Sequence, residues 1–137
     1  MTPTFLTTEV DLRRHISEPP ALTVAKVVSR LAPSAQAWIA DAQMVGIALQ
    51  RADGHVHVVA RIQRDGLAVA RDAQRVHLDN APETTVGELP ANIPPTTTAG
   101  ALFMLPGTES TLRANGTALF SKSGDEIELR VTETYMH

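Results

Sequence analysis

The chain has 137 residues, of which 43% are hydrophobic and 20% charged, and its formal net charge is -3. This length suits one domain with one core, and the charge gives no bulk attraction toward nucleic acid or an anionic membrane. The sequence holds no cysteine, which excludes disulfides, thiolate metal sites and cysteine nucleophiles. No apolar run approaches the roughly 20 residues of a transmembrane helix. We therefore expect a cytoplasmic protein that binds neither nucleic acid nor membrane.

Residues 1–20 are predicted to form an N-terminal arm, and residues 21–137 the single domain. Pro19 and Pro20 end any structure that precedes them, because proline lacks an amide donor. Two helices are then expected, the first over 22–31 and the second beginning at Pro33, which suits a first helical turn. Each has an apolar stripe at helical spacing. The two stripes are Leu22, Ala25, Val28 and Leu31, then Ala35, Trp38, Ile39 and Ala42.

The pattern changes to a period of two after the second helix, which predicts strands. Val45, Ile47 and Leu49 alternate with smaller or polar residues, and Asp53-Gly54 then favours a tight hairpin turn. A third strand is expected near 67–70, a turn at 71–74 and a fourth strand at 75–79. The return strand of the hairpin has two faces, one with Val56, Val58, Ala60 and Ile62, the other with His55, His57, Val59 and Arg61.

The segment from Asn80 to Thr98 is rich in proline and ends in a run of threonines. Since proline blocks both helix and central strand, we expect a long loop here. Three further strands are predicted at 99–105, 112–122 and 126–135, the last two joined by a turn at Ser123-Gly124-Asp125. The fold class is therefore mainly β with short helices, as a closed or nearly closed antiparallel barrel.

Three stretches together resemble the pyridoxamine 5'-phosphate oxidase-like, flavin-nucleotide-binding split-barrel family. They are PPALTVAKVVSRLAPSAQAWIADAQMVGIALQRADG, the strand ending in VVAR, and LFMLPGTESTLRANGTA, with the closing VTETYMH similar to the last strand of the family. The third stretch, with its Pro-Gly turn and TLR-x-NG strand, is the most specific. The resemblance implies a split β-barrel that forms a homodimer and holds flavin mononucleotide (FMN) at the subunit interface.

The same resemblance implies a set of cofactor-binding residues. Arg61 stands at the arginine of a family motif and would contact the phosphate, for which the planar guanidinium is well suited. Arg113 and Asn115 occupy the TLR-x-NG motif, and His57 shares the predicted face of Arg61. The full expected set is His57, Val59, Arg61, Arg113, Asn115 and Glu133.

The chain also departs from the family pattern. Val59 stands where the motif has serine, Ile62 where it has glycine, and no Lys or Arg lies between Arg75 and Arg113. Each charge-assisted hydrogen bond is worth about 1.5–3 kcal/mol. Losing two of them would move a micromolar phosphate site toward the millimolar range.

Each candidate residue also has a structural interpretation. His55 and His57 are better explained as strand residues than as metal ligands, so no metal site is predicted. Arg61 could be solvated or paired with an acid, and Arg113 could pair with Glu126 or Glu128 on the next strand. Glu133, Tyr135 and His137 are expected on the face of Ile127, Leu129 and Val131, either as a group at the barrel rim or as a strand end entering solvent.

Two functions from different classes follow from these residues. The first is an FMN-dependent oxidoreductase of unspecified substrate, in which the flavin performs the redox chemistry. The second is a diverged barrel that has lost flavin. It would bind another small molecule, act without a cofactor through the rim of Glu133, Tyr135 and His137, or serve as a non-catalytic partner. A deazaflavin cofactor or haem remains an alternative ligand.

Overall fold

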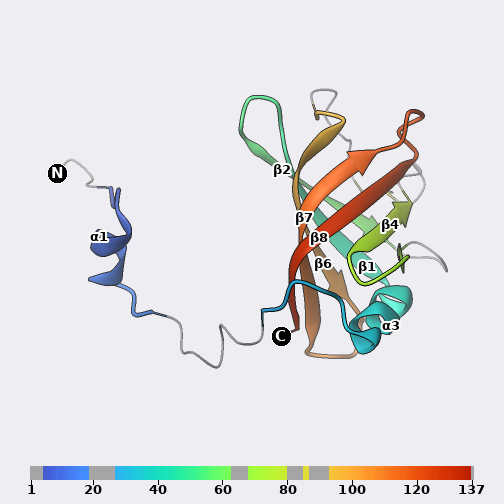
Figure 1. Ribbon diagram of the computed structural model, residues 1–137, viewed down its shortest axis with the longest axis horizontal. Coiled ribbons are helices and arrows are strands. Elements are labelled where there is room, and N and C mark those ends of the chain that lie inside the picture. The colour runs from blue at the N-terminus through green and yellow to red at the C-terminus, as the bar shows by residue number, and fades with distance from the viewer. Residues whose placement is uncertain (1–4, 19–26, 63–67, 80–84, 87–92, 137) are drawn as a thin grey trace.

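The computed structural model describes residues 5–18, 27–62, 68–79, 85–86 and 93–136. It contains two short helices, α1 (Glu9–Arg13) and α3 (Pro33–Asp41). Its strands are β1 (Met44–Gln50), β2 (Val56–Ile62), β3 (Ala68–Ala70), β4 (Arg75–Asp79), β5 (Thr85–Val86), β6 (Thr96–Met104), β7 (Thr111–Phe120) and β8 (Glu126–Met136). The prediction of a mainly β chain with short helices is confirmed (Figure 1).

The eight strands form one antiparallel sheet in the order β3-β4-β8-β7-β6-β1-β2-β5. Within the described residues the two edge strands, β3 and β5, are not joined by a ladder, so hydrogen bonds do not close the sheet. The sheet is strongly curled in Figure 1. One face of it forms the core, and α3 lies at one end (Figure 1), adding Ala35 and Ile39 to that core.

The core face is built by strict alternation along the strands. In β1 the side chains of Val45, Ile47 and Leu49 are buried, while those between them are not. Their neighbours across the ladders lie on the same face, because residues in register share it, and these neighbours are buried except for the half-buried His57. The core face also includes Val59, Val76, Leu78, Ala101, Phe103, Leu112, Ala114, Ile127 and Leu129.

Tight turns connect the strands much as the sequence predicted. Gly54 has φ of +87° and its amide donates to the carbonyl of Arg51 at 3.0 Å, so the Asp53-Gly54 turn is confirmed. Glycine is favoured at that φ because it has no Cβ. At 71–74 the Asp72 carboxylate accepts from the amides of Gln74 and Arg75 at 2.8 and 2.9 Å, which fixes the turn before β4.

The helix expected over 22–31 is wrong in the part that the structure describes. Val28 is extended and forms an isolated bridge with Thr134, exchanging backbone hydrogen bonds of 3.0 and 2.7 Å. The pairing with β8 therefore overrides the helical spacing of the apolar residues, and Leu31 is buried from a non-helical segment. Residues 22–26 lie outside the described part. The second helix is confirmed, with Pro33 in its first turn.

Two further predictions need correction. The threonine run, Thr96–Thr98, was assigned to the long loop but begins β6, as the high strand propensity of threonine allows. Thr97 is buried, and its hydroxyl donates to the carbonyl of Gln50 at 2.5 Å. Within the same predicted loop, residues 85–86 pair with β2, while 80–84 and 87–92 lie outside the described residues. In the predicted arm, residues 9–13 form α1, none of which is buried.

Candidate functional site

The outer face of the central strands carries two adjoining hollows. Three residues of this face are small where β1 and β6 run side by side, namely Gly46 and Ala48 of β1 and Gly100 of β6, which lies across from Ala48. An added Cβ at Gly46 would meet no heavy atom within 4 Å. The small residues therefore form a low floor on the sheet, with room for a ligand above it.

The larger hollow has a volume of about 490 Å³. Its polar side chains come from four strands, namely Gln50 of β1, Thr98 of β6, Asn115 of β7, and Thr132 and Glu133 of β8. Its remaining lining residues are Ala48, Leu49, Val56, Ala99, Gly100 and Gly116.

The smaller hollow has a volume of about 320 Å³. Val58 and Leu102 supply large apolar side chains, and Arg113 is the one charged residue among the described residues that line it. The floor consists of Gly46, Ala48, Gly100 and Ala101. Ala48, Gly100 and Asn115 line both hollows. The two therefore form one trough with a shared middle.

Asn115 occupies the middle of this trough and is held in place on two sides. Its Nδ2 donates to Oε1 of Glu133 at 2.7 Å. Its Oδ1 lies directly over Gly100, where an added Cβ would approach that oxygen to 2.8 Å. Because Gly100 has no side chain, the Asn115 amide oxygen lies close to the β6 backbone, within the trough.

Arg113 lies two residues before Asn115 on the same face of β7 and is exposed. Its guanidinium carbon is 5.9 Å from the ring centroid of Tyr135, its partner across the β7–β8 ladder. The alternative pairing of Arg113 with Glu126 or Glu128 is not formed. Glu128 instead binds His77 at 3.2 Å and Arg130 at 3.0 Å.

Glu133 and Tyr135 are on the opposite face from the one predicted, because β8 contains a bulge. The register shifts between Asn115 and Gly116, which face Glu133 and Val131 respectively, so Thr132 is an extra residue. One extra residue reverses the faces of all that follow. Thr134, only 2% exposed, therefore takes the core position. His137, the third residue of the predicted rim, lies outside the described residues.

The other predicted residues lie on the core face of β2. Arg61 and Val59 are 0% and 1% exposed, and His57 is half-buried beside them. They pair with Val45, Ile47 and Leu49 of the β1 core face. Burial lowers the pKa of Arg61, while the charge of Asp79 acts in the opposite direction. The structure thus brings Arg113, Asn115 and Glu133 together and places His57, Val59 and Arg61 on the other side of the sheet.

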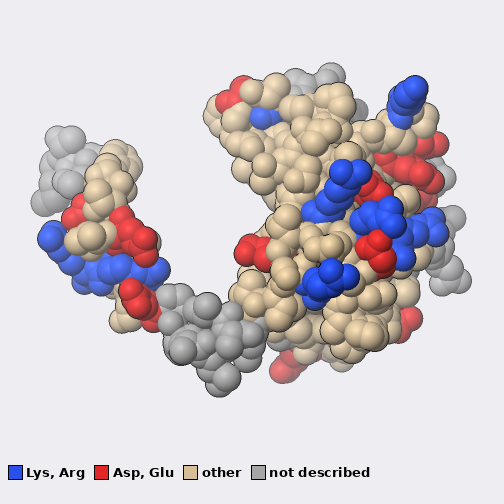
Figure 2. All heavy atoms as spheres, viewed as in Figure 1, with Lys and Arg blue, Asp and Glu red and all other residues tan. Residues whose placement is uncertain are grey.

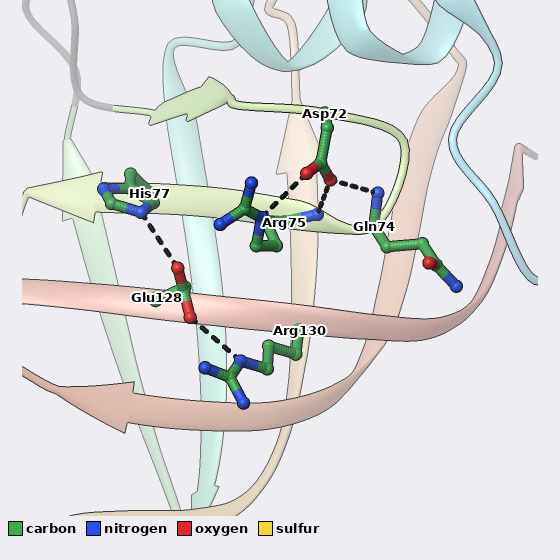
Figure 3. Close-up of polar contacts among 6 residues, drawn as sticks. All are labelled: Asp72, Gln74, Arg75, His77, Glu128 and Arg130. Carbon is green, nitrogen blue, oxygen red and sulfur yellow. Dashed lines mark hydrogen bonds and ion pairs between the residues drawn. The ribbon is translucent and has the colours of Figure 1, made fainter.

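An ion-pair network lies on the outer face of β4 and β8 (Figure 3). His77 and Arg130 bind the two oxygens of Glu128, and Arg75 Nε donates to Asp72 at 2.7 Å. Figure 2 shows Lys and Arg side chains lying among Asp and Glu on this side of the molecule. A hollow of about 400 Å³ is lined by Arg30, Asp72, Gln74, Arg75, Arg130 and Val131. Since carboxylates offset two of its three arginines, we interpret the network as structural.

Several residues of the trough could not be found from the sequence. Gln50, Thr98 and Thr132 carry no motif. The only signal for Gln50 and Thr132 is the outward position that strand alternation gives them, and Thr98 lies in a segment that was expected to be a loop. No cluster of three potential metal ligands occurs among the residues described by the structure. No helix in that part of the chain is long and apolar enough to span a bilayer.

The chain was compared with models of known protein families, with curated proteins and with solved structures, and none of the three comparisons found a match. The geometry of the trough and the resemblance of the TLR-x-NG stretch are therefore the grounds for assigning a function.

Proposed function

We propose that the protein is a split-barrel, FMN-binding oxidoreductase whose flavin lies in the outer-face trough. The observation that carries the proposal is the low floor of Gly46, Ala48 and Gly100 beside the Arg113–Asn115 pair. A planar aromatic ring needs a flat apolar floor, and polar groups at its edge to orient it. The smaller hollow supplies both, with Val58 and Leu102 as apolar walls.

The residues of this chain would have distinct roles toward FMN. Among the described residues, Arg113 is the one cationic side chain that lines the trough. It would contact an anionic part of the nucleotide, because guanidinium binds phosphate and carbonyl oxygens well. Asn115 offers an amide at the ring edge. Bound flavin supplies the redox chemistry, and the protein supplies binding and orientation. With a single guanidinium we expect weak affinity, with a Kd on the order of 0.1–1 mM.

The barrel and the dimer belong to the same proposal. Asp79 of β4 and Arg61 of β2 interact electrostatically although four strands lie between β4 and β2 in the sheet order, which supports a sheet curled into a split barrel. Val56 and Val58 project from the outer face of β2 with 65% and 68% of their surface exposed. A second copy of the chain would cover these valines and enclose the trough, as apolar patches at subunit interfaces do.

The test is a titration of the purified protein with FMN, followed by quenching of flavin fluorescence. We expect saturable binding that weakens at least tenfold in Arg113→Gln and is lost in Ala48→Leu, whose longer side chain fills both hollows. Arg71→Gln removes an exposed arginine away from the trough and should bind as the unaltered protein does. Absence of saturation at 3 mM FMN, or equal affinities of the Arg113 and Arg71 variants, would overturn the proposal.

A second candidate function is a flavin-free small-molecule-binding protein that uses the same trough. The observation in its favour is the burial of Arg61, which leaves the trough with one lining arginine. A protein of this kind would fail the FMN titration yet bind another ligand in the larger hollow.

A further inference from the structure

The larger hollow has a charge opposite to that of its neighbour. Of the described residues that line it, Glu133 alone carries a charge, and none is Lys, Arg or His. The smaller hollow has Arg113 as its charged residue. The ends of the trough therefore differ in sign, and an anionic group is disfavoured at the Glu133 end.

The charge of Glu133 is not neutralised by a basic side chain in the described part of the chain. Arg113 is its diagonal neighbour across the β7–β8 ladder, a spacing at which long side chains reach one another. The guanidinium lies instead over the ring of Tyr135. The carboxylate accepts from Asn115 Nδ2, which uses one of about four acceptor positions. The remaining positions are available to a ligand.

Other acceptors surround the carboxylate. Asn115 Oδ1 lies over Gly100 within the trough, and the hydroxyls of Thr98 and Thr132 and the side-chain amide of Gln50 line the same hollow. A group that donates several hydrogen bonds and carries a positive charge is complementary to such a set. An ammonium or an amidinium group has both properties.

We propose that the Glu133 hollow binds small molecules through a positively charged nitrogen, with Glu133 as the counter-ion and Asn115 as the residue that positions it. The proposal deepens the function proposed above and rests on it, because it assigns the substrate class of the trough whose other hollow would hold the flavin. Substrates would then be amines or amidines whose uncharged part lies over Ala48 and Gly100.

The test uses n-butylammonium as the probe, in a titration of the flavin-free protein followed by ¹⁵N–¹H NMR at constant ionic strength. We expect saturable shifts at the Asn115 side chain and at the Gly100 amide. The neutral n-butanol and the anionic butyrate should bind at least tenfold more weakly. Glu133→Gln should weaken n-butylammonium binding about tenfold, whereas the matched Glu126→Gln, on the same strand but outside the hollow, should not. The spectra also report whether each variant is folded.

The outcomes separate this proposal from the flavin proposal. If FMN fails to bind but n-butylammonium binds in a Glu133-dependent way, the cation site stands and the flavin proposal falls. If FMN binds but n-butylammonium does not saturate at 100 mM, the flavin proposal stands and the cation site is refuted. Equal affinities for n-butylammonium and n-butanol, or an unchanged affinity in Glu133→Gln, also refute the cation site.

Discussion

Gly116 lies beside the bulge, in close contact with the backbone of β8. A Cβ at this position would lie 1.8 Å from the carbonyl oxygen of Arg130, 2.8 Å from its carbonyl carbon and 3.2 Å from the amide nitrogen of Thr132. All three are backbone atoms. They cannot retreat toward β4, because Val131 N already donates to Gln74 O at 2.7 Å on that side. Gly116→Ala must therefore break part of the β7–β8 ladder.

The magnitude of this effect follows from the contacts. Overpacking against well-fixed groups costs about 1–3 kcal/mol, and here the neighbour is backbone, so the upper end applies. Loss of one ladder hydrogen bond adds about 1 kcal/mol. We expect Gly116→Ala to lower the free energy of unfolding by about 3–4 kcal/mol, which for a chain of this size lowers Tm by roughly 10 °C.

The assay is urea unfolding followed by fluorescence of Trp38, the single tryptophan of the chain. Trp38 packs against the core, and its Nε1 donates to Phe103 O at 3.4 Å, so its environment changes on unfolding. Two other glycines of the sheet serve as controls. Gly46→Ala meets nothing within 4 Å, and Gly100→Ala meets only the amide end of Asn115 at 2.8 Å. If the free energies of unfolding of Gly116→Ala and Gly46→Ala agree within 0.5 kcal/mol, the close approach of Gly116 to the β8 backbone is refuted.

Three further predictions concern other parts of the molecule. Phe103→Ala removes a fully buried ring from the core and should lower the free energy of unfolding by about 3–5 kcal/mol in urea unfolding; a loss below 1 kcal/mol would contradict its place in the core. Arg61→Ala removes a buried side chain and should lower the free energy of unfolding by about 2 kcal/mol. Arg61→Met keeps the apolar stem and should lower it less. FMN titration of the same variants tests the predicted phosphate contact, because that contact requires both variants to bind FMN more weakly. The pKa of Asp72 lies below its usual value, because the amide of Gln74 and, to a smaller extent, the side chain of Arg75 bind the carboxylate. The contribution of Asp72 to stability is therefore complete above its unfolded-state pKa, and it is lost as pH falls through the lower folded-state pKa. Asp72→Asn should therefore reduce stability at pH 7 and flatten its decline below about pH 4, and an unchanged acid limb in urea unfolding would argue against this contribution.

Much of the sheet could be predicted from the sequence because its signals are local. Alternation in β1 and the Asp53-Gly54 turn fixed the first hairpin, and β4 has the predicted bounds, Arg75–Asp79. The buried face of β2 could not be predicted in this way. Alternation separates Val56 and Val58 from Val59 and Arg61, but it does not say which pair is buried. Hydrophobicity alone would favour the two outward valines, whereas the register with β1 places Arg61 inside.

The remaining differences come from contacts that are distant in the sequence. Val28 was expected in a helix because of its spacing, yet it bridges Thr134, 106 residues later. The run Thr96–Thr98 adjoins two prolines and was assigned to a loop, yet it pairs with β7 from Thr117 to Leu119. Local propensity is a weak prior when a partner strand is available. A single sequence does not indicate which distant strand will pair with a given segment.

The bulge links the stability of the fold to the composition of the candidate site. If β8 kept its initial register with β7, Asn115 would face Thr132, and Glu133 would point into the core with Leu129 and Val131. A buried carboxylate without a partner is strongly unfavourable. The extra residue, Thr132, instead places Thr134 in the core, where its hydroxyl donates to Arg113 O at 2.8 Å. It also places Glu133 beside Asn115 on the outer face. Since only glycine at 116 admits this bulge, Gly116→Ala should remove binding of n-butylammonium even under conditions where the variant remains folded.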